Sequence, residues 1–273
     1  MKLFVVAVPR FSARHKYINQ HLREISSLPT EIVGVDGANT PRTPDIISEA
    51  AKGFSAGQMG CSLAHASACR RICELGLEWA VVVEDDVVLP KNFDEIINII
   101  AEHIRPGELI SLYNPTMKSA LYSTYGSTAV QEMRLLYPMQ LRSLRTTAVY
   151  VIHRDAACAI ADGNKPVKYT ADDYRDMYTD GLIKFIRVLQ PSPVRIKGFP
   201  STIRHVRKGS LKTTARTLVN SIPGLRTFME FRRRWLRAKR LNNVETTDEP
   251  SPLMRPNPAF RQCIPMETRV SAL

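Results

Sequence analysis

Residues 79–86 read Trp-Ala-Val-Val-Val-Glu-Asp-Asp, an apolar run that ends abruptly in three acids. A run that is apolar at almost every position is typical of a strand buried on both faces, as in a parallel sheet between helices. Unpaired carboxylates are costly to bury, so we expect the acids at the carboxyl edge of that sheet, where open α/β folds bind ligands. The stretch therefore predicts both the fold class and a site.

Strands and helices alternate on either side of this stretch. Further strands are predicted at 2–8, 31–35, 109–113, 147–152 and 185–189, and helices after residue 14 and over 62–75, 93–104, 155–161 and 172–183. Residues 38–57 and 114–140 show no strong period and are expected to form loops. This alternation predicts an α/β fold, with a mostly parallel sheet covered by helices on both faces.

Composition and cysteine usage exclude several classes of protein. The 273 residues are 44% hydrophobic and 23% charged, which is typical of a soluble globular chain and not of a disordered one. No apolar run reaches the roughly 18 residues of a membrane-spanning helix, and residues 1–11 lack the cleavage site of a signal peptide. Five cysteines without a CxxC pair disfavour disulfides and a structural zinc site. Cys61, Cys69, Cys73 and Cys158 are therefore interpreted as packing residues in a reducing cytoplasm.

The three acids are candidate ligands for a divalent cation. Successive strand residues point to opposite faces, so Glu84 and Asp86 are expected on one side and Asp85 on the other. Two carboxylates on one side suit Mg²⁺ or Mn²⁺, which also binds phosphate oxygens and neutralises charge on a departing diphosphate. This chemistry fits transfer from a nucleotide-diphosphate donor. The alternative is a solvated acidic turn that caps the next helix.

A second candidate motif lies at residues 57–65, Gly-Gln-Met-Gly-Cys-Ser-Leu-Ala-His. We expect a glycine-bearing loop to open a helix whose first turn carries Ser62 and His65. The free backbone N–H groups and positive dipole end of such a helix attract phosphate. The alternative is that Ser62 caps the helix and His65 is exposed one turn later.

Together the two motifs resemble the central signature of glycosyltransferase family 25. This family includes bacterial lipopolysaccharide and lipooligosaccharide galactosyltransferases and collagen galactosyltransferases. Its pattern is a Gly-Cys-x-x-Ser-His helix start, followed by an apolar strand that ends in Glu-Asp-Asp. Residues 60–65 and 84–86 match this pattern except at Ala64, where the family has Ser. The likeness extends from residue 2 to about residue 190.

The resemblance implies a GT-A-like fold and an inverting enzyme that uses a UDP-sugar, most often UDP-galactose, with Mn²⁺ or Mg²⁺. Carried over to this chain, it implies that Glu84 and Asp86 bind the metal and that His65 contacts phosphate or orients a carboxylate. It also implies nucleotide-sugar contacts by Val6, Ala7, Val8, Arg14, Asp36, Gly60 and Asp85.

Inverting transfer also needs a base that accepts the proton of the acceptor hydroxyl. Asp172 and Asp173 are the candidates, because they stand where a loop is expected to meet a helix. Either one can instead cap that helix.

The net charge of +12 is concentrated in one segment. Residues 204–240 hold 12 Lys and Arg against Glu230 alone, whereas residues 1–203 hold 23 basic and 21 acidic residues. Within the segment, residues 211–240 space their apolar side chains as basic amphipathic helices on an anionic membrane do. We therefore expect a GT-A-like domain at 1–203, a membrane-associating helical segment at 204–240 and a loosely ordered tail at 241–273.

These features predict a cytoplasmic enzyme that is peripherally associated with the inner membrane and acts on a lipid-linked glycan. Arg-rich runs also suit nucleic acids, but the body shows neither an aromatic RNA platform nor a helix-turn-helix pattern. A helix packed on the body's own acidic face is a third interpretation of the basic segment. For the whole chain the alternatives are a non-catalytic protein that binds nucleotide sugars or anionic surfaces, and a glycosyltransferase with another donor or glycan acceptor.

Overall fold

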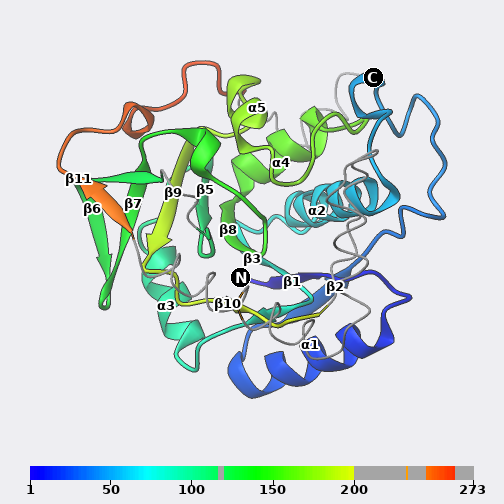
Figure 1. Ribbon diagram of the computed structural model, residues 1–273, viewed down its shortest axis with the longest axis horizontal. Helices are drawn as coiled ribbons and strands as arrows, with labels where there is room; N and C mark the ends of the chain where they lie inside the picture. The colour runs from blue at the N-terminus through cyan, green and yellow to red at the C-terminus, as the bar shows by residue number, and fades with distance from the viewer. Residues whose placement is uncertain (116–119, 200–231, 233–243, 262–273) are drawn as a thin grey trace.

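The computed structural model describes residues 1–115, 120–199, 232 and 244–261. Within them, a nine-stranded sheet carries helices on both faces (Figure 1). The strands lie in the order β11-β6-β7-β9-β5-β8-β3-β1-β2, and β7 and β8 run against the other seven. These strands are β1 (Leu3–Val6), β2 (Thr30–Val33), β3 (Trp79–Glu84), β5 (Glu108–Ser111), β6 (Leu121–Val130), β7 (Met133–Pro138), β8 (Val149–His153), β9 (Phe185–Gln190) and β11 (Glu245–Thr247).

A two-stranded sheet joins β4 (Val87–Val88) to β10 (Arg195–Ile196). The helices are α1 (Ser12–Ile25), α2 (Ala56–Glu74), α3 (Phe93–Ala101), α4 (Arg154–Gly163) and α5 (Tyr174–Thr179), with short 3₁₀ turns at η1 (Glu49–Ala51), η2 (Leu141–Ser143) and η3 (Pro252–Met254). The predicted mostly parallel α/β sheet is confirmed, because only β7 and β8 oppose the common strand direction among the described residues of that sheet.

The side chains of β3 alternate between two cores, because successive strand residues point to opposite faces. Ala80 and Val82 pack toward α2, α4 and α5, whereas Val81 and Val83 pack toward α1 and α3. All four are 0% exposed, which confirms a strand buried on both faces. The alternation then places Glu84, the last residue of β3, on the face that α2 covers.

Two neighbours of β3 determine what lies beside Glu84. β1 runs parallel to β3, with Val6 opposite Glu84, whereas β8 runs antiparallel, with Val149 opposite Val83. The end of β3 therefore meets the end of β1 on one side and the start of β8 on the other. The antiparallel direction of β8 brings the residues just before it to the acidic end of β3.

The predicted loop over residues 114–140 is wrong from residue 121 to residue 138, where β6 and β7 form an antiparallel hairpin. The turn includes Gln131, with a φ of 53°. The strand pattern was hidden because the register of β6 shifts between Ser123 and Thr128, around Gly126. A bulge of this kind breaks the period of two on which strand prediction depends.

Residues 244–261 differ from the loosely ordered tail expected at 241–273, because they pack against the sheet. β11 pairs in parallel with β6. The Ser251 hydroxyl donates a hydrogen bond to the carbonyl of Pro138 at 2.6 Å, and Asn257 is 6% exposed. A proline-rich composition does not stop a segment from being held by hydrogen bonds to a neighbouring strand.

The basic segment 204–240 lies outside the described residues except for Arg232. Its amphipathic helices and membrane role therefore stay predictions. Among the helices that the structure describes, none is long and apolar enough to cross a membrane.

A disulfide between Cys73 and Cys158 joins α2 to α4 and corrects the interpretation of both as packing residues. The two are 85 positions apart in sequence, and helix packing brings their Cα atoms to 5.7 Å. Spacing alone cannot reveal a pair of this kind, because it depends on which helices are neighbours. Cys61 and Cys69 are free thiols in the described part of the chain.

Candidate active site

A pocket opens where the ends of β1 and β3 meet the first turns of α1 and α2. Its walls include all the residues expected to contact the nucleotide sugar: Val6, Ala7, Val8, Arg14, Asp36, Gly60 and Asp85. Glu84 and Cys61 also line it. The fold thus gathers the predicted residues at the carboxyl edge of the sheet, while their roles toward a nucleotide stay predictions.

Two glycines let α2 approach the end of β2 beside this pocket. A Cβ atom at Gly60 would lie 2.7 Å from the carbonyl oxygen of Val35, and one at Gly37 would lie 2.0 Å from that of Ala56. Neither position has room for a larger residue. Gly60 is therefore explained by the close packing of α2, whatever it contributes to ligand binding.

The acids at the end of β3 face two different partners. Glu84 faces α2, with its Oε1 atom 3.8 Å from His65 Nε2. Asp85 and Asp86 share Arg14, whose guanidinium donates a hydrogen bond to Asp85 and lies 3.5 Å from a carboxylate oxygen of Asp86. This differs from the expected placement of Glu84 with Asp86. The physical reason is that β3 ends at Glu84, so the strand alternation does not continue through the turn.

Arg14 neutralises the acidic turn from within the fold. The residue is only 9% exposed, and its guanidinium carbon lies 5.3 Å from the ring centre of Phe199. Buried charges are tolerated when they are paired and hydrogen-bonded. Arg14 lines the pocket as predicted, but Asp85 and Asp86 already engage its positive charge.

Glu84 is held as a carboxylate inside the pocket. Its Oε1 atom accepts a hydrogen bond from the Thr147 hydroxyl at 2.8 Å. Burial by itself would raise the pKa of Glu84, but His65, Thr147 and Arg14 together stabilise the charged form and hold the pKa below its ordinary value. Glu84 is therefore ionised at neutral pH.

His65 does not stand at a helix N-terminus, because α2 begins at Ala56. Ser55 and Gln58 form a capping box there: the Gln58 N–H donates to the Ser55 hydroxyl at 3.3 Å, and the Ser55 N–H donates to the Gln58 side chain at 3.0 Å. The free N–H groups of a helix belong to its first turn. Ser62 and His65 lie further along, so the predicted phosphate site at their backbone is not supported.

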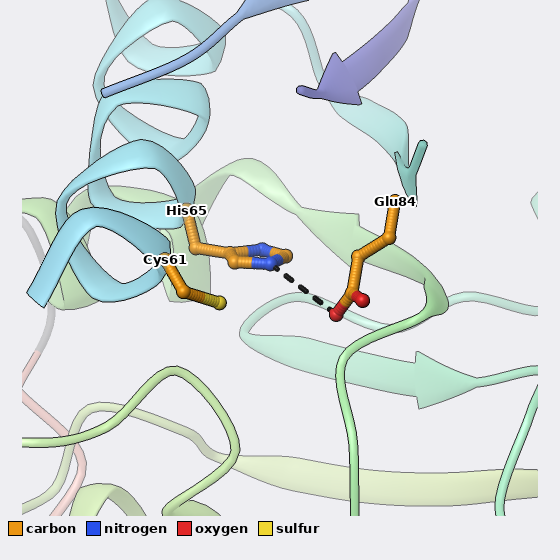
Figure 2. A group of neighbouring side chains, drawn as sticks. All are labelled: Cys61, His65 and Glu84. Carbon is orange, nitrogen blue, oxygen red and sulfur yellow. Dashed lines mark ion pairs between the residues drawn. The ribbon is translucent and has the colours of Figure 1, made fainter. Parts of the chain in front are cut away.

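Cys61, His65 and Glu84 instead form a side-chain cluster (Figure 2). Cys61 and His65 are one turn apart on α2 and therefore project from the same face. One possible ligand atom from each of the three residues lies within 4.8 Å of the other two. His65 Nδ1 is 3.0 Å from the Tyr150 hydroxyl, which leaves Nε2 directed at Glu84.

Cys61 was expected to serve packing alone, yet it belongs to this cluster. Burial, followed by the charges of Glu84, Asp172 and Asp85, raises the pKa of Cys61 well above its ordinary value. The side chain is therefore a neutral thiol at neutral pH. The spacing of four residues to His65 on a helix is the one sequence signal that could have linked the two.

Asp172 and Asp173 precede α5 in different surroundings. The Asp172 carboxylate accepts hydrogen bonds from the Thr146 N–H at 3.4 Å and the Thr170 hydroxyl at 3.1 Å, and its charge acts on Cys61. Asp173 occupies the N-cap position of α5 but makes no side-chain cap hydrogen bond. Burial, followed by the charges of two neighbouring aspartates, raises the pKa of Asp173. Of the two candidates, Asp172 is the one whose charge raises the pKa of Cys61 in the cluster.

Arg10 is a site residue that the sequence analysis missed. Its guanidinium donates to both carboxylate oxygens of Asp36 at 2.6 Å, and its side chain is 51% exposed where it lines the pocket. Asp36 also accepts a hydrogen bond from the Ala38 N–H at 3.0 Å. The available signal was the place of Arg10 just after an apolar strand, at the sheet edge that binds ligands.

A family model described as glycosyltransferase family 25 (LPS biosynthesis protein) matches residues 1–175. No curated protein matches the chain. The matched range contains the pocket, the Cys61–His65–Glu84 cluster, and both Asp172 and Asp173.

Proposed function

This chain belongs to glycosyltransferase family 25, a family of lipopolysaccharide biosynthesis proteins, and we propose that it transfers galactose from UDP-galactose to a lipopolysaccharide or lipooligosaccharide core, with inversion. The observation that carries the proposal is the pocket at the ends of β1 and β3. Its wall contains carboxylates and arginines together with residues 6–8, which follow and include the end of β1. Acids and cations placed together at such an edge suit the transfer of a group from an anionic donor.

The donor is proposed to lie along this pocket. The backbone of residues 6–8 and the Asp36 carboxylate can bind the nucleoside, and Arg10 is exposed enough to reach the diphosphate. An α/β sheet with its pocket at the strand ends also supports a GT-A-like fold.

The expected Mn²⁺ or Mg²⁺ ion does not fit Glu84 and Asp86 as they are placed. Hard cations prefer several oxygen ligands. Arg14 lies against Asp85 and Asp86, and Glu84 faces His65 instead. We therefore assign stabilisation of the leaving diphosphate to the Arg10 guanidinium. Metal dependence stays a prediction, which assays with and without a chelator test.

The base is proposed to be Asp172. Its carboxylate is fixed by Thr146 and Thr170 and lies close enough for its charge to act on Cys61 in the pocket wall. A base fixed in this way can accept the acceptor's proton as the new glycosidic bond forms. His65 is proposed to orient Glu84 within the pocket.

The acceptor is proposed to be a lipid-linked glycan at the cytoplasmic face of the inner membrane. The support is the charge of residues 204–240, because each Lys or Arg near an anionic leaflet contributes about 1 kcal/mol. Co-sedimentation with vesicles of anionic and neutral lipids tests this. Loss of binding when 211–240 is deleted supports the proposal, and equal recovery with both vesicle types contradicts it.

The reaction is tested by UDP release from UDP-galactose in the presence of a lipooligosaccharide core acceptor, with UDP-glucose and UDP-N-acetylglucosamine as competing donors. Acceptor-dependent release with a clear preference for UDP-galactose supports the proposal. Turnover with another donor in preference to UDP-galactose would change the proposed donor sugar and leave the reaction class unchanged. UDP binding without turnover on any acceptor favours the non-catalytic alternative. Arg10→Met should weaken UDP binding about tenfold or more, since hydrogen bonds to charged groups contribute about 1.5–3 kcal/mol.

A further inference from the structure

The cluster of Cys61, His65 and Glu84 has a use beyond the proposed transfer reaction. We propose that Cys61 Sγ, His65 Nε2 and a Glu84 carboxylate oxygen bind one transition-metal ion of the Zn²⁺ class, whose fourth coordination position opens to the pocket. The inference depends on this ligand set, and it holds whichever donor the enzyme uses.

The ligand atoms are already near the spacing that zinc requires. With bonds of about 2.0–2.3 Å in a tetrahedral arrangement, ligand atoms lie about 3.3–3.7 Å apart. His65 Nε2 and Glu84 Oε1 are 3.8 Å apart, and all three atoms fall within 4.8 Å of one another. Figure 2 shows the thiol and the imidazole projecting from the same helix face toward the carboxylate. Small side-chain rotations would complete the site.

The identity of the ligands favours zinc over magnesium or manganese. Thiolate and imidazole ligands select Zn²⁺ and similar ions, whereas Mg²⁺ and Mn²⁺ prefer sites made of oxygen. The proposed ligand set of a thiolate, an imidazole and a carboxylate therefore differs from the carboxylate pair, Glu84 and Asp86, that the sequence predicted. It also gives Glu84 a metal-binding role that does not require it to share an ion with the Arg14-bound acids.

A second, independent observation that points to a bound ion is the state of the His65 Nε2 atom. The residue is 4% exposed, and its Nε2 atom is buried without a hydrogen-bond partner. Buried polar atoms are nearly always satisfied, and an unsatisfied one calls for an explanation such as an ion. Nδ1 is engaged by the Tyr150 hydroxyl, which orients the ring and leaves Nε2 for the ion.

Two hydroxyl groups that hydrogen-bond to the proposed ligands, those of Tyr150 and Thr147, also support a metal site. Hydrogen bonds to the far side of ligating groups fix their orientation and make them better ligands. Tyr150 holds His65 in this way, and Thr147 holds Glu84 at 2.8 Å.

The experiment uses the full chain after dialysis against a chelator, with Co²⁺ as a spectroscopic probe and Zn²⁺ titrated against a chromophoric chelator. We expect one equivalent of metal, a thiolate-to-cobalt charge-transfer band, and displacement of Co²⁺ by Zn²⁺. Cys61→Ser should abolish the band, and His65→Gln should weaken Zn²⁺ binding at least tenfold. Tyr150→Phe should weaken it by about 10–100-fold, the range typical of a lost supporting hydrogen bond.

Cys263→Ser is the matched control, because it removes a cysteine that is not one of the three proposed ligands. It should retain the band and the affinity. The proposal is overturned when the unmodified protein binds no Zn²⁺ at micromolar concentrations, when Cys61→Ser keeps the band, or when Cys263→Ser loses it. If Cys61→Ser fails to fold by thermal melting, His65→Gln decides, and unchanged affinity in that variant overturns the proposal. None of these readouts requires sugar transfer, so failure of the proposed function would leave them unaffected.

Discussion

Thr147 donates a hydrogen bond of 2.8 Å to Glu84, across the junction between the start of β8 and the end of β3. The residue before it, Thr146, donates through its backbone N–H to Asp172 at 3.4 Å and has a φ of 70°. A positive φ is uncommon for a β-branched residue and persists only where its surroundings hold it. One pair of threonines therefore links the carboxylate in the pocket to the proposed base.

Thr147→Val removes the hydroxyl while keeping the side-chain shape. The pKa of Glu84 should rise, because a hydrogen bond that stabilises its charged form is lost. Since the carboxylate disappears as the pH falls through that pKa, the acid limb of the kcat/KM profile should move to higher pH. Activity at neutral pH should fall about 10–150-fold, the factor that corresponds to about 1.5–3 kcal/mol for a hydrogen bond to a charged group. Thr30→Val, which removes an exposed hydroxyl of β2, is the control and should leave the profile unchanged.

Asp172→Asn should lower kcat about 10²–10⁴-fold, the usual contribution of a positioned base. Asp173→Asn should retain activity within a few-fold, because Asp172, and not Asp173, is among the charges that raise the pKa of Cys61. Burial raises the pKa of Asp173, so its charge opposes folding at neutral pH and the amide should not lower the melting temperature. The measurement is steady-state turnover of both variants beside Asp176→Asn. A larger loss for Asp173→Asn would transfer the role of base to that residue.

Arg14→Met should destabilise the protein by about 3–5 kcal/mol, because it leaves the buried Asp85 carboxylate without its counter-charge. Asp85 is only 5% exposed and cannot regain its hydration. Arg10→Met is the matched control, since the Arg10–Asp36 pair has a half-exposed arginine and such pairs contribute about 0–1 kcal/mol. Urea unfolding compares the two. Equal midpoints would mean that Arg14 does not stabilise the acidic turn.

Replacing both Cys73 and Cys158 with Ser should lower the free energy of unfolding by about 2–4 kcal/mol, the usual effect of a disulfide. A thiol reductant should lower the melting temperature of the unmodified protein and leave that of the double variant unchanged. Insensitivity of the unmodified protein to reductant would show that the bond between α2 and α4 is not formed in solution.

The sequence by itself determined the central strands and the place of the acids. A strand packed between two layers of helices must be apolar on both faces, so the run from Trp79 to Val83 could form little else. Carboxylates cannot be buried unpaired, so Glu84 had to lie at the sheet edge. The other residues of the pocket were implied by the resemblance to glycosyltransferase family 25, and they meet because parallel strands end at a common edge.

Only the tertiary structure decided how those residues pair. Strand direction places Thr147 beside Glu84, helix packing joins Cys73 to Cys158, and the turn after β3 sends Asp85 and Asp86 to Arg14. Likewise, the packing of α2 on the sheet brings Cys61 and His65 to Glu84. The physical reason is that the local pattern of apolar and polar residues indicates only which positions must be buried. Which buried side chains meet is determined by contacts between segments that are far apart in the chain.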